Sequence, residues 1–224
     1  MAIRKDTFSQ QVFDHVVESI RSGELSPGDR VTEQMLVDRL GISHAPVREA
    51  LQALTREGLI VTHPHKGRQI KSFSSREIIE TAFIAGALEG ALAVLALRNN
   101  KEKQLIRLQD IVNEMERVGF GEGSLPKLEK LGSEFHYVVC GQDRLSAMAL
   151  YARKLCSNMT KLLYYRHWKT IYTHEEIVER HKYILDVIIS GNSEQIESVI
   201  RQHHNEVGKR LCECLVNLGV VESE

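Results

Sequence analysis

The chain has 224 residues, of which 42% are hydrophobic and 26% are charged, and this composition excludes a disordered, collagen-like or fibrous protein. Only 4 prolines and 15 glycines occur, with long stretches free of both, so a mainly helical fold is favoured over a β-sandwich. Because 29 Lys and Arg offset 30 Asp and Glu, the net charge is -1, and any nucleic-acid binding requires a local basic surface.

The cysteines and the apolar stretches indicate a cytoplasmic protein. The four cysteines form no C-x-x-C pair and stand in helical patterns, which predicts free thiols in a reducing compartment: Cys140, Cys156, Cys212 and Cys214. The first residues contain no apolar core of a secretory signal. The most apolar stretch, residues 78–97, carries Glu80 and Glu89, so we expect a buried helix there and not a membrane span.

The first 73 residues predict three helices and a β-hairpin. An apolar stripe with helical spacing ends at Gly23 and marks the first helix. A short second helix is expected over residues 33–40, and a third follows after Ser43, whose side chain is expected to cap it. Two β-prone runs, 59–63 and 68–72, then predict a hairpin, or wing, with a basic tip.

From residue 75 onward the pattern is helical almost throughout. The expected helices cover residues 75–98, 101–119, 124–141, 144–166, 174–190 and 192–218, with a break at Asn99 and Asn100 between the first two. Six such helices with short connections favour an antiparallel bundle of about six helices. We therefore expect two domains, residues 1–73 and residues 74–224.

The turn between the second and third helices has the pattern of a DNA-reading helix-turn-helix. Ser43 and the free N–H groups of the next turn can bind phosphate, and Arg48 can bind phosphate or guanine. His44 stands where a base edge is within reach, and Pro46 is tolerated because it lies in the first helical turn. The alternative is an ordinary three-helix cluster in which Arg48 is a solvated surface charge.

The hairpin tip adds a second set of candidate DNA contacts. Gly67 lets the tip bend close to phosphates, Lys66 and Arg68 supply charge, and His65 supplies a hydrogen-bond donor. In the alternative interpretation the hairpin is a solvated turn.

Three runs in this half, residues 23–30, 36–51 and 54–60, resemble the winged helix-turn-helix domain of GntR-type bacterial transcription regulators. The resemblance spans residues 8–73. It implies DNA contacts at Ser43, Arg48 and Gly67, and also at the following positions: Gln34, His44 and Ala45. Members of the family usually carry Arg then Thr at the last two, so a guanidinium for bidentate guanine binding is missing here, and a different operator sequence or weaker binding is expected.

Three histidines lie on the inward stripes of three different predicted helices: His136, His181 and His203. Neutral imidazoles from facing helices can form a transition-metal site in a helical bundle, although a lone histidine on an apolar face is more often a core residue. His204 lies one residue off its stripe and is set aside.

Residues 75–218 resemble the all-helical FCD ligand domain of the FadR-like branch of this family, through Phe135-His136 and the span from His181 to His203. The resemblance implies that the three histidines, with an Asp one turn before the first, bind zinc, nickel or a similar ion that helps hold a small carboxylate effector. Here that Asp position is Gly132, and Glu134 points away. An Arg usually found one turn before Glu89 is replaced by Ala85. Two interpretations stay open: three histidines with open positions for water or effector, or a site that has lost its metal.

The leading hypothesis is a ligand-responsive bacterial transcription regulator that binds a palindromic operator as a homodimer, and repression is the commoner mode in the family. Residues 73–75 form the expected hinge. One alternative is a metal-dependent enzyme of the three-histidine type, which lacks H-E-x-x-H and an obvious general base. The other is a helical adaptor with a degenerate DNA-binding domain.

Overall fold

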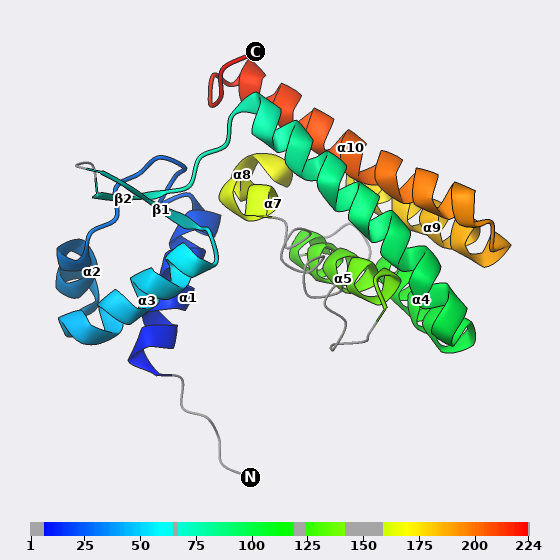
Figure 1. Cartoon of the computed structure of the whole chain (residues 1–224), viewed down its shortest axis with the longest axis horizontal. Helices are drawn as coiled ribbons and strands as arrows, with labels where there is room; N and C mark the ends of the chain where they lie inside the picture. Colours follow the sequence, from blue (N-terminus) through cyan, green and yellow to red (C-terminus); the bar gives the residue numbers. More distant parts are fainter. Residues whose placement is uncertain (1–6, 65–66, 119–123, 142–158, 224) are drawn as a thin grey trace, which may run out of the picture. The chain divides into compact units, whose positions relative to one another are not determined.

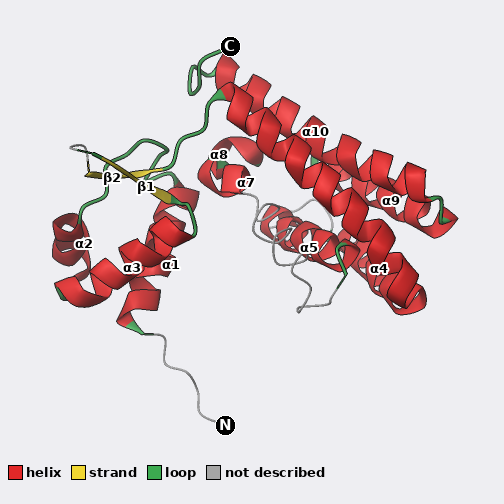
Figure 2. Ribbon diagram, viewed as in Figure 1, coloured by secondary structure: helices red, strands yellow, loops and turns green. Residues whose placement is uncertain are grey.

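A computed structural model of the chain describes residues 7–64, 67–118, 124–141 and 159–223. The mainly helical prediction is confirmed, with a two-stranded antiparallel sheet as the wing (Figure 2). Two compact units are present: Met1–Phe73 with Met159–Arg166, and Ser74–Asn158 with His167–Glu224. The short segment Met159–Arg166 belongs to the first unit, which the sequence did not indicate.

The first unit contains the expected helices α1 (Phe8–Ser22), α2 (Glu33–Leu40) and α3 (His44–Arg56). Their buried faces follow the helical period, and together they form one apolar core: Val12, Val16, Ile20, Leu36, Val47, Leu51 and Leu54. Strands β1 (Ile60–His63) and β2 (Gly67–Ile70) pair from Ile60 with Ile70 to His63 with Gly67. The second strand of the wing begins at Gly67, whose φ of 80° is unfavourable for other residues.

Helix α3 starts differently from the prediction. Ser43 has the extended conformation of an N-cap residue, but its side chain makes no capping hydrogen bond. By contrast, Thr7 and Thr32 cap α1 and α2 in the usual way, each accepting from a backbone N–H at 3.1 Å. The first turn of α3 thus keeps its N–H groups free of a Ser43 cap.

Helix α7 (Met159–Leu163) packs against α1 inside the first unit. The buried hydroxyl of Tyr164, just after α7, accepts from the N–H of Phe73 at 3.0 Å and donates to its carbonyl at 3.2 Å. Within the described part of residues 144–166, two short helices, α7 and α8 (Tyr165–Trp168), replace the single helix expected there. Most of that expected helix, together with Cys156, lies outside the described residues.

The second unit is built on a single long helix, α4 (Ser75–Arg117), where we expected two helices with a break at Asn99 and Asn100. That prediction was wrong because asparagine is only a mediocre helix former, which costs a few tenths of a kcal/mol, about 0.7 at most, whereas Gly or Pro would cost about 1 to 3 kcal/mol. Ser74 and Glu77 form a capping box at its start. Helices α5 (Ser124–Val139), α9 (His174–Ser190) and α10 (Ser193–Asn217) complete the bundle and lie close to the predicted ranges.

The core of this unit is apolar and continuous across α4, α5, α9 and α10. Phe135, Leu108 and Ile200 at its centre are fully buried. Within the described residues, Ser75–Arg98 is one stretch long and apolar enough to cross a membrane. However, 44% of its apolar 18-residue window is buried, and the stretch carries the buried carboxylate of Glu89. Among the described cysteines, Cys140, Cys212 and Cys214 form no disulfide.

Helices α4 and α10 pack side by side (Figure 1), and glycines make that approach possible. A Cβ on Gly86 would lie 2.9 Å from the Cα of Arg201, and one on Gly208 would lie 2.4 Å from the Cβ of Ala82. Because a side chain at either position would overlap the opposite helix, these residues determine how closely the two helices meet. The same approach brings Glu89 on α4 next to residues of α10.

Candidate functional site

The first candidate site is the exposed start of α3. Ser43, His44, Ala45 and Arg48 are exposed and Pro46 is half-buried, while Val47 and Ala50 on the opposite side are in the core. The candidate DNA-contacting residues of α3 thus share the outer surface of the helix N-terminus, where backbone N–H groups and the helix dipole favour phosphate. On the wing, Gly67 and Arg68 belong to β2, and His65 and Lys66 lie outside the described residues.

The carboxylate of Glu33, which the sequence did not indicate as part of this site, binds two of its arginines. Glu33, at the start of α2, accepts from Arg48 Nη2 at 3.1 Å and from Arg68 Nη1 at 3.4 Å. Its Oε2 also lies 3.9 Å from His44 Nδ1, whereas Gln34 next to it donates to Asp38 at 2.6 Å. The Arg48 hydrogen bond is the main reason that the pKa of the Glu33 carboxyl is below its usual value.

The second candidate site is the histidine cluster of the second unit. His136 on α5, His181 on α9 and His203 on α10 converge, and their ligand atoms lie within 4.8 Å of one another. Their ring centroids are 5.0 Å (136 to 203), 5.3 Å (136 to 181) and 5.4 Å (181 to 203) apart. Three imidazoles bound to one tetrahedral ion at ~2.0 Å have centroids roughly 5 Å apart, so the residues fit a transition-metal ion.

Two residues that the sequence analysis left out also belong to this cluster. Glu89 on α4 is 1% exposed; its Oε1 lies 2.5 Å from His136 Nδ1 and its Oε2 lies 2.9 Å from His204 Nε2. Setting His204 aside was wrong, because its side chain is buried against α4 and not directed outward. The signal in the sequence was a carboxylate within the mostly apolar stretch 78–97.

The electrostatics of the cluster favour ligand chemistry. Burial alone would raise the pKa of the Glu89 carboxyl, but His136 and His204 outweigh it and hold that pKa well below its usual range. Burial is also the main reason that the pKa of His203 is well below its usual value, followed by the neighbouring histidines and Arg180. A neutral imidazole is the form that binds metal, and burial favours that form of His203.

The position that would carry an Asp in the family lies beside the cluster. A Cβ built on Gly132 would be 3.3 Å from His181 Nε2. His181 Nδ1 lies 2.6 Å from the carbonyl of Ile177, to which it donates, so Nε2 carries the lone pair. Glu134 pairs with Arg107 on α4 and does not take the place of that carboxylate.

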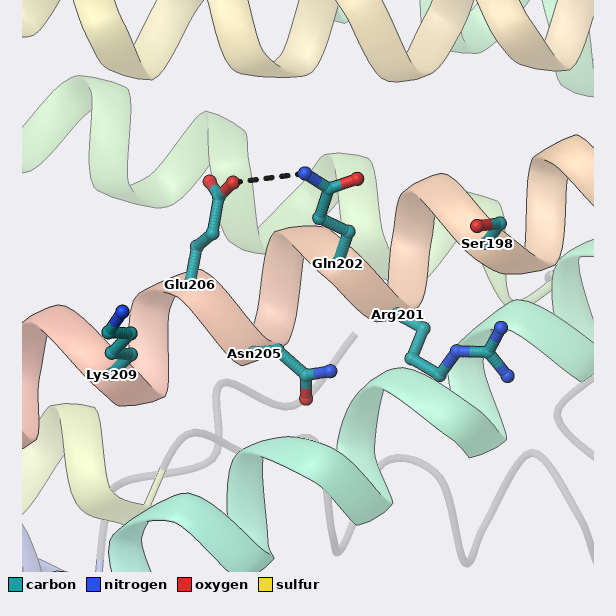
Figure 3. A pocket seen from close by; sticks show the side chains of 6 residues that line it. All are labelled: Ser198, Arg201, Gln202, Asn205, Glu206 and Lys209. Carbon is teal, nitrogen blue, oxygen red and sulfur yellow. Dashed lines mark hydrogen bonds between the residues drawn. The ribbon is translucent and has the colours of Figure 1, made fainter.

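A surface hollow of about 290 Å³ lies on the outer side of α10 (Figure 3). Six polar side chains line it: Ser198, Arg201, Gln202, Asn205, Glu206 and Lys209. Gln202 donates to Glu206 at 3.2 Å, and the hollow mixes both signs of charge. His203 and His204 on the same helix are buried, so the hollow and the histidine cluster are distinct places.

A winged helix-turn-helix unit joined to a helical unit with a buried histidine cluster defines a DNA-binding regulator with a ligand-sensing domain. Residues 8–70 match the model of the bacterial regulatory proteins of the gntR family, and residues 80–206 match the FCD domain. The chain belongs to the GntR-type transcription regulators with an FCD domain, and it is a ligand-responsive DNA-binding protein.

Known proteins with similar sequences are described as regulators and not as enzymes. The chain is 27% identical to the "probable D-xylose utilization operon transcriptional repressor" of Paenarthrobacter nicotinovorans, over 90% of this chain and 87% of that protein. It is 26% identical to the "HTH-type transcriptional regulator LutR" of Bacillus subtilis, over 84% of this chain and 94% of that protein.

Solved structures share the fold. That of E. coli McbR/YncC has a TM-score of 0.67 at 20% identity and covers 92% of this chain and 98% of that one. The structure of a putative GntR regulator from Rhodococcus sp. RHA1 has a TM-score of 0.64 at 17% identity, and the match covers 91% of this chain and 96% of that one.

Proposed function

We propose that this regulator is a cytoplasmic repressor that binds a palindromic operator as a homodimer, with α3 in the major groove. The observation that carries the proposal is the exposed N-terminus of α3, where Ser43, His44 and Arg48 face outward above a fully buried inner face. Exposed apolar side chains on α4, Ile79, Phe83 and Ile84, support a subunit contact in the second unit. A two-fold dimer would place two α3 helices about one DNA turn apart, ~34 Å.

The histidine cluster is proposed to bind a divalent transition metal such as zinc or nickel through His136, His181 and His203. When bound, such an ion supplies a Lewis acid with open coordination positions for a small carboxylate-like anion. The Nδ1 bond of His181 leaves the lone pair of that ring on Nε2, and burial favours the neutral form of His203.

Signal transfer is proposed to pass through the junction of the two units. Phe73 is bonded through both backbone groups to Tyr164 of the first unit, and Ser74 caps α4 of the second. Each side of the 73–74 bond is therefore tied to its own unit, which makes this bond a suitable hinge. Effector binding would shift the population of hinge states and thereby the spacing of the DNA-reading helices.

Selection of bound fragments from random DNA, followed by sequencing, tests the DNA part of the proposal. The expected result is an inverted repeat whose half-sites are about 10 base pairs apart, centre to centre. Binding with no sequence preference at all would contradict it and favour the adaptor alternative.

Elemental analysis of the untagged protein tests the metal part. About one equivalent of zinc or nickel is expected in the wild type, and a strong loss in His136→Ala. No metal after incubation with excess ion would contradict the site. His181→Ala is further expected to change the response to effector while leaving operator binding intact in the effector-free protein, and a mere loss of stability would identify His181 as a core residue.

A further inference from the structure

The carboxylate of Glu89 is enclosed between two imidazoles that come from two other helices. It is 1% exposed, and each of its two oxygens contacts a different imidazole: Oε1 that of His136 on α5 and Oε2 that of His204 on α10. A buried carboxylate is strongly unfavourable unless its oxygens are hydrogen-bonded. The metal ligands proposed above do not include Glu89 or His204, so this arrangement requires its own explanation.

The distances identify hydrogen bonds and not a second metal site. The N···O separation is 2.9 Å for His204, within the range of charge-assisted hydrogen bonds, and 2.5 Å for His136, which is shorter than that range. Two donors on one tetrahedral ion at ~2.0 to 2.1 Å would stand roughly 3.3 Å apart. Each contact to Glu89 therefore uses one imidazole N–H.

This assignment determines the tautomer of His136. Since its Nδ1 donates to Glu89, the lone pair is on Nε2, and the ring packs 5.3 Å from the His181 ring and 5.0 Å from the His203 ring between centroids. A ligating histidine that donates its other N–H to a carboxylate is held in orientation and becomes more basic.

We infer that Glu89 is the positioning residue of the metal site: it holds His136 as an Nε2 ligand, and His204 in turn holds Glu89. We call Glu89, His136 and His204 the relay. It supplies the negative charge that Gly132 does not provide, but this charge comes from Glu89 on α4 and acts on the far nitrogen of His136 instead of binding the ion directly. The inference rests on the proposed metal site and adds to it one residue that acts on the ion through His136 and a second that acts through Glu89.

The packing of α4 on α10 gives the relay its geometry. Gly86 lies one turn before Glu89 on α4, and a Cβ there would lie 3.0 Å from the Cβ of His204. A larger residue at position 86 would separate the helices at the level of the Glu89 contact to His204. The relay therefore depends on the fold of this unit and not on a local motif.

Cobalt(II) is a suitable probe, because its visible absorption reports coordination geometry and its affinity is measured by competition with a chelator. In Glu89→Gln the amide keeps the shape and can still accept from His136, but the charge is lost. The expected result is Co²⁺ binding weakened by roughly 10 to 100-fold, with an unchanged absorption spectrum at saturation. Glu134→Gln, two residues from His136 and engaged with Arg107, is the matched control and should bind as the wild type does.

His204→Gln separates the two steps of the relay. It should weaken binding less than Glu89→Gln, and the double variant should be no worse than Glu89→Gln alone, because His204 acts through Glu89. Additive losses would overturn the relay. Equal affinities of Glu89→Gln and wild type would also overturn it, and a changed Co²⁺ spectrum would show that Glu89 is itself a ligand.

The wild-type protein distinguishes failure of the relay from failure of the site. If the wild type binds no Co²⁺, the proposed metal site is wrong and the relay falls with it. If the wild type binds one equivalent and the Glu89 variant binds equally well, only the relay is wrong. Two equivalents in the wild type would contradict the assignment of the Glu89 contacts as hydrogen bonds.

Discussion

Restoring the carboxylate that the family carries at position 132 is a direct test of the histidine cluster. A Cβ at Gly132 would lie 3.3 Å from His181 Nε2 and 3.6 Å from its Cε1, so the carboxylate of Gly132→Asp would begin next to the lone pair that is proposed to bind metal. The matched control is Gly132→Ala, which adds the same Cβ without a ligand.

The expected magnitudes differ between the metal-free and metal-bound states. In α5, replacing glycine by alanine gains about 1 kcal/mol in helix propensity, part of which is lost because the Cβ crowds His181. In the metal-free protein Gly132→Asp should be no more stable than Gly132→Ala, because its carboxylate would be placed next to the buried His181 ring without an ion to bind. With metal, a fourth protein ligand should tighten binding at least ~10-fold, about 1.4 kcal/mol.

Thermal melting at a fixed excess of Zn²⁺, with and without chelator, measures both states. At equal free metal, a ~10-fold tighter site adds about 1.4 kcal/mol of stability, which corresponds to a rise in Tm of roughly 3 to 6 °C for a chain of this size. Equal metal-dependent shifts in the Asp and Ala variants would refute the placement of position 132 beside the ion.

Three further substitutions test other parts of the structure. Arg48→Ala should cost ~1 to 3 kcal/mol of operator affinity and reduce by about one the slope of log affinity against log salt concentration. Arg56→Ala, at the far end of α3, should leave both unchanged, and equal losses in the two variants would exclude a specific contact of Arg48. Glu33→Gln should increase the affinity for non-specific DNA and steepen its salt dependence, because it removes the negative charge that now pairs with two arginines. Weaker non-specific binding would instead show that Glu33 mainly holds these arginines in place. Gly208→Ala should cost ~1 to 3 kcal/mol in urea unfolding because its Cβ would overlap that of Ala82 at 2.4 Å, and an unchanged midpoint would mean that α4 and α10 can separate freely.

Local signals in the sequence were sufficient for most helices and for the wing. Gly191 ends α9 as expected, and the apolar stripes of α1 to α3 became the core of the first unit. The prediction failed where the local signal was ambiguous: Asn99 and Asn100 resemble a loop but continue α4, and the hydroxyl of Ser43 does not cap α3. Such choices depend on what packs around a segment, which a single segment does not contain.

The sequence by itself determined the regulator class, through its resemblance to a known family. It also determined the outer residues of α3 and the three inward histidines, because helical periodicity and motif spacing are local properties. Only the tertiary structure decided that Glu33 binds the two arginines and that Glu89 joins His136 to His204. These contacts join residues 15 to 115 positions apart, and they form because packed helices bring charges together that water would otherwise keep solvated. For Glu89 the deciding factor is steric, since glycines on α4 and α10 let the two helices approach closely enough to bury a carboxylate with both of its partners.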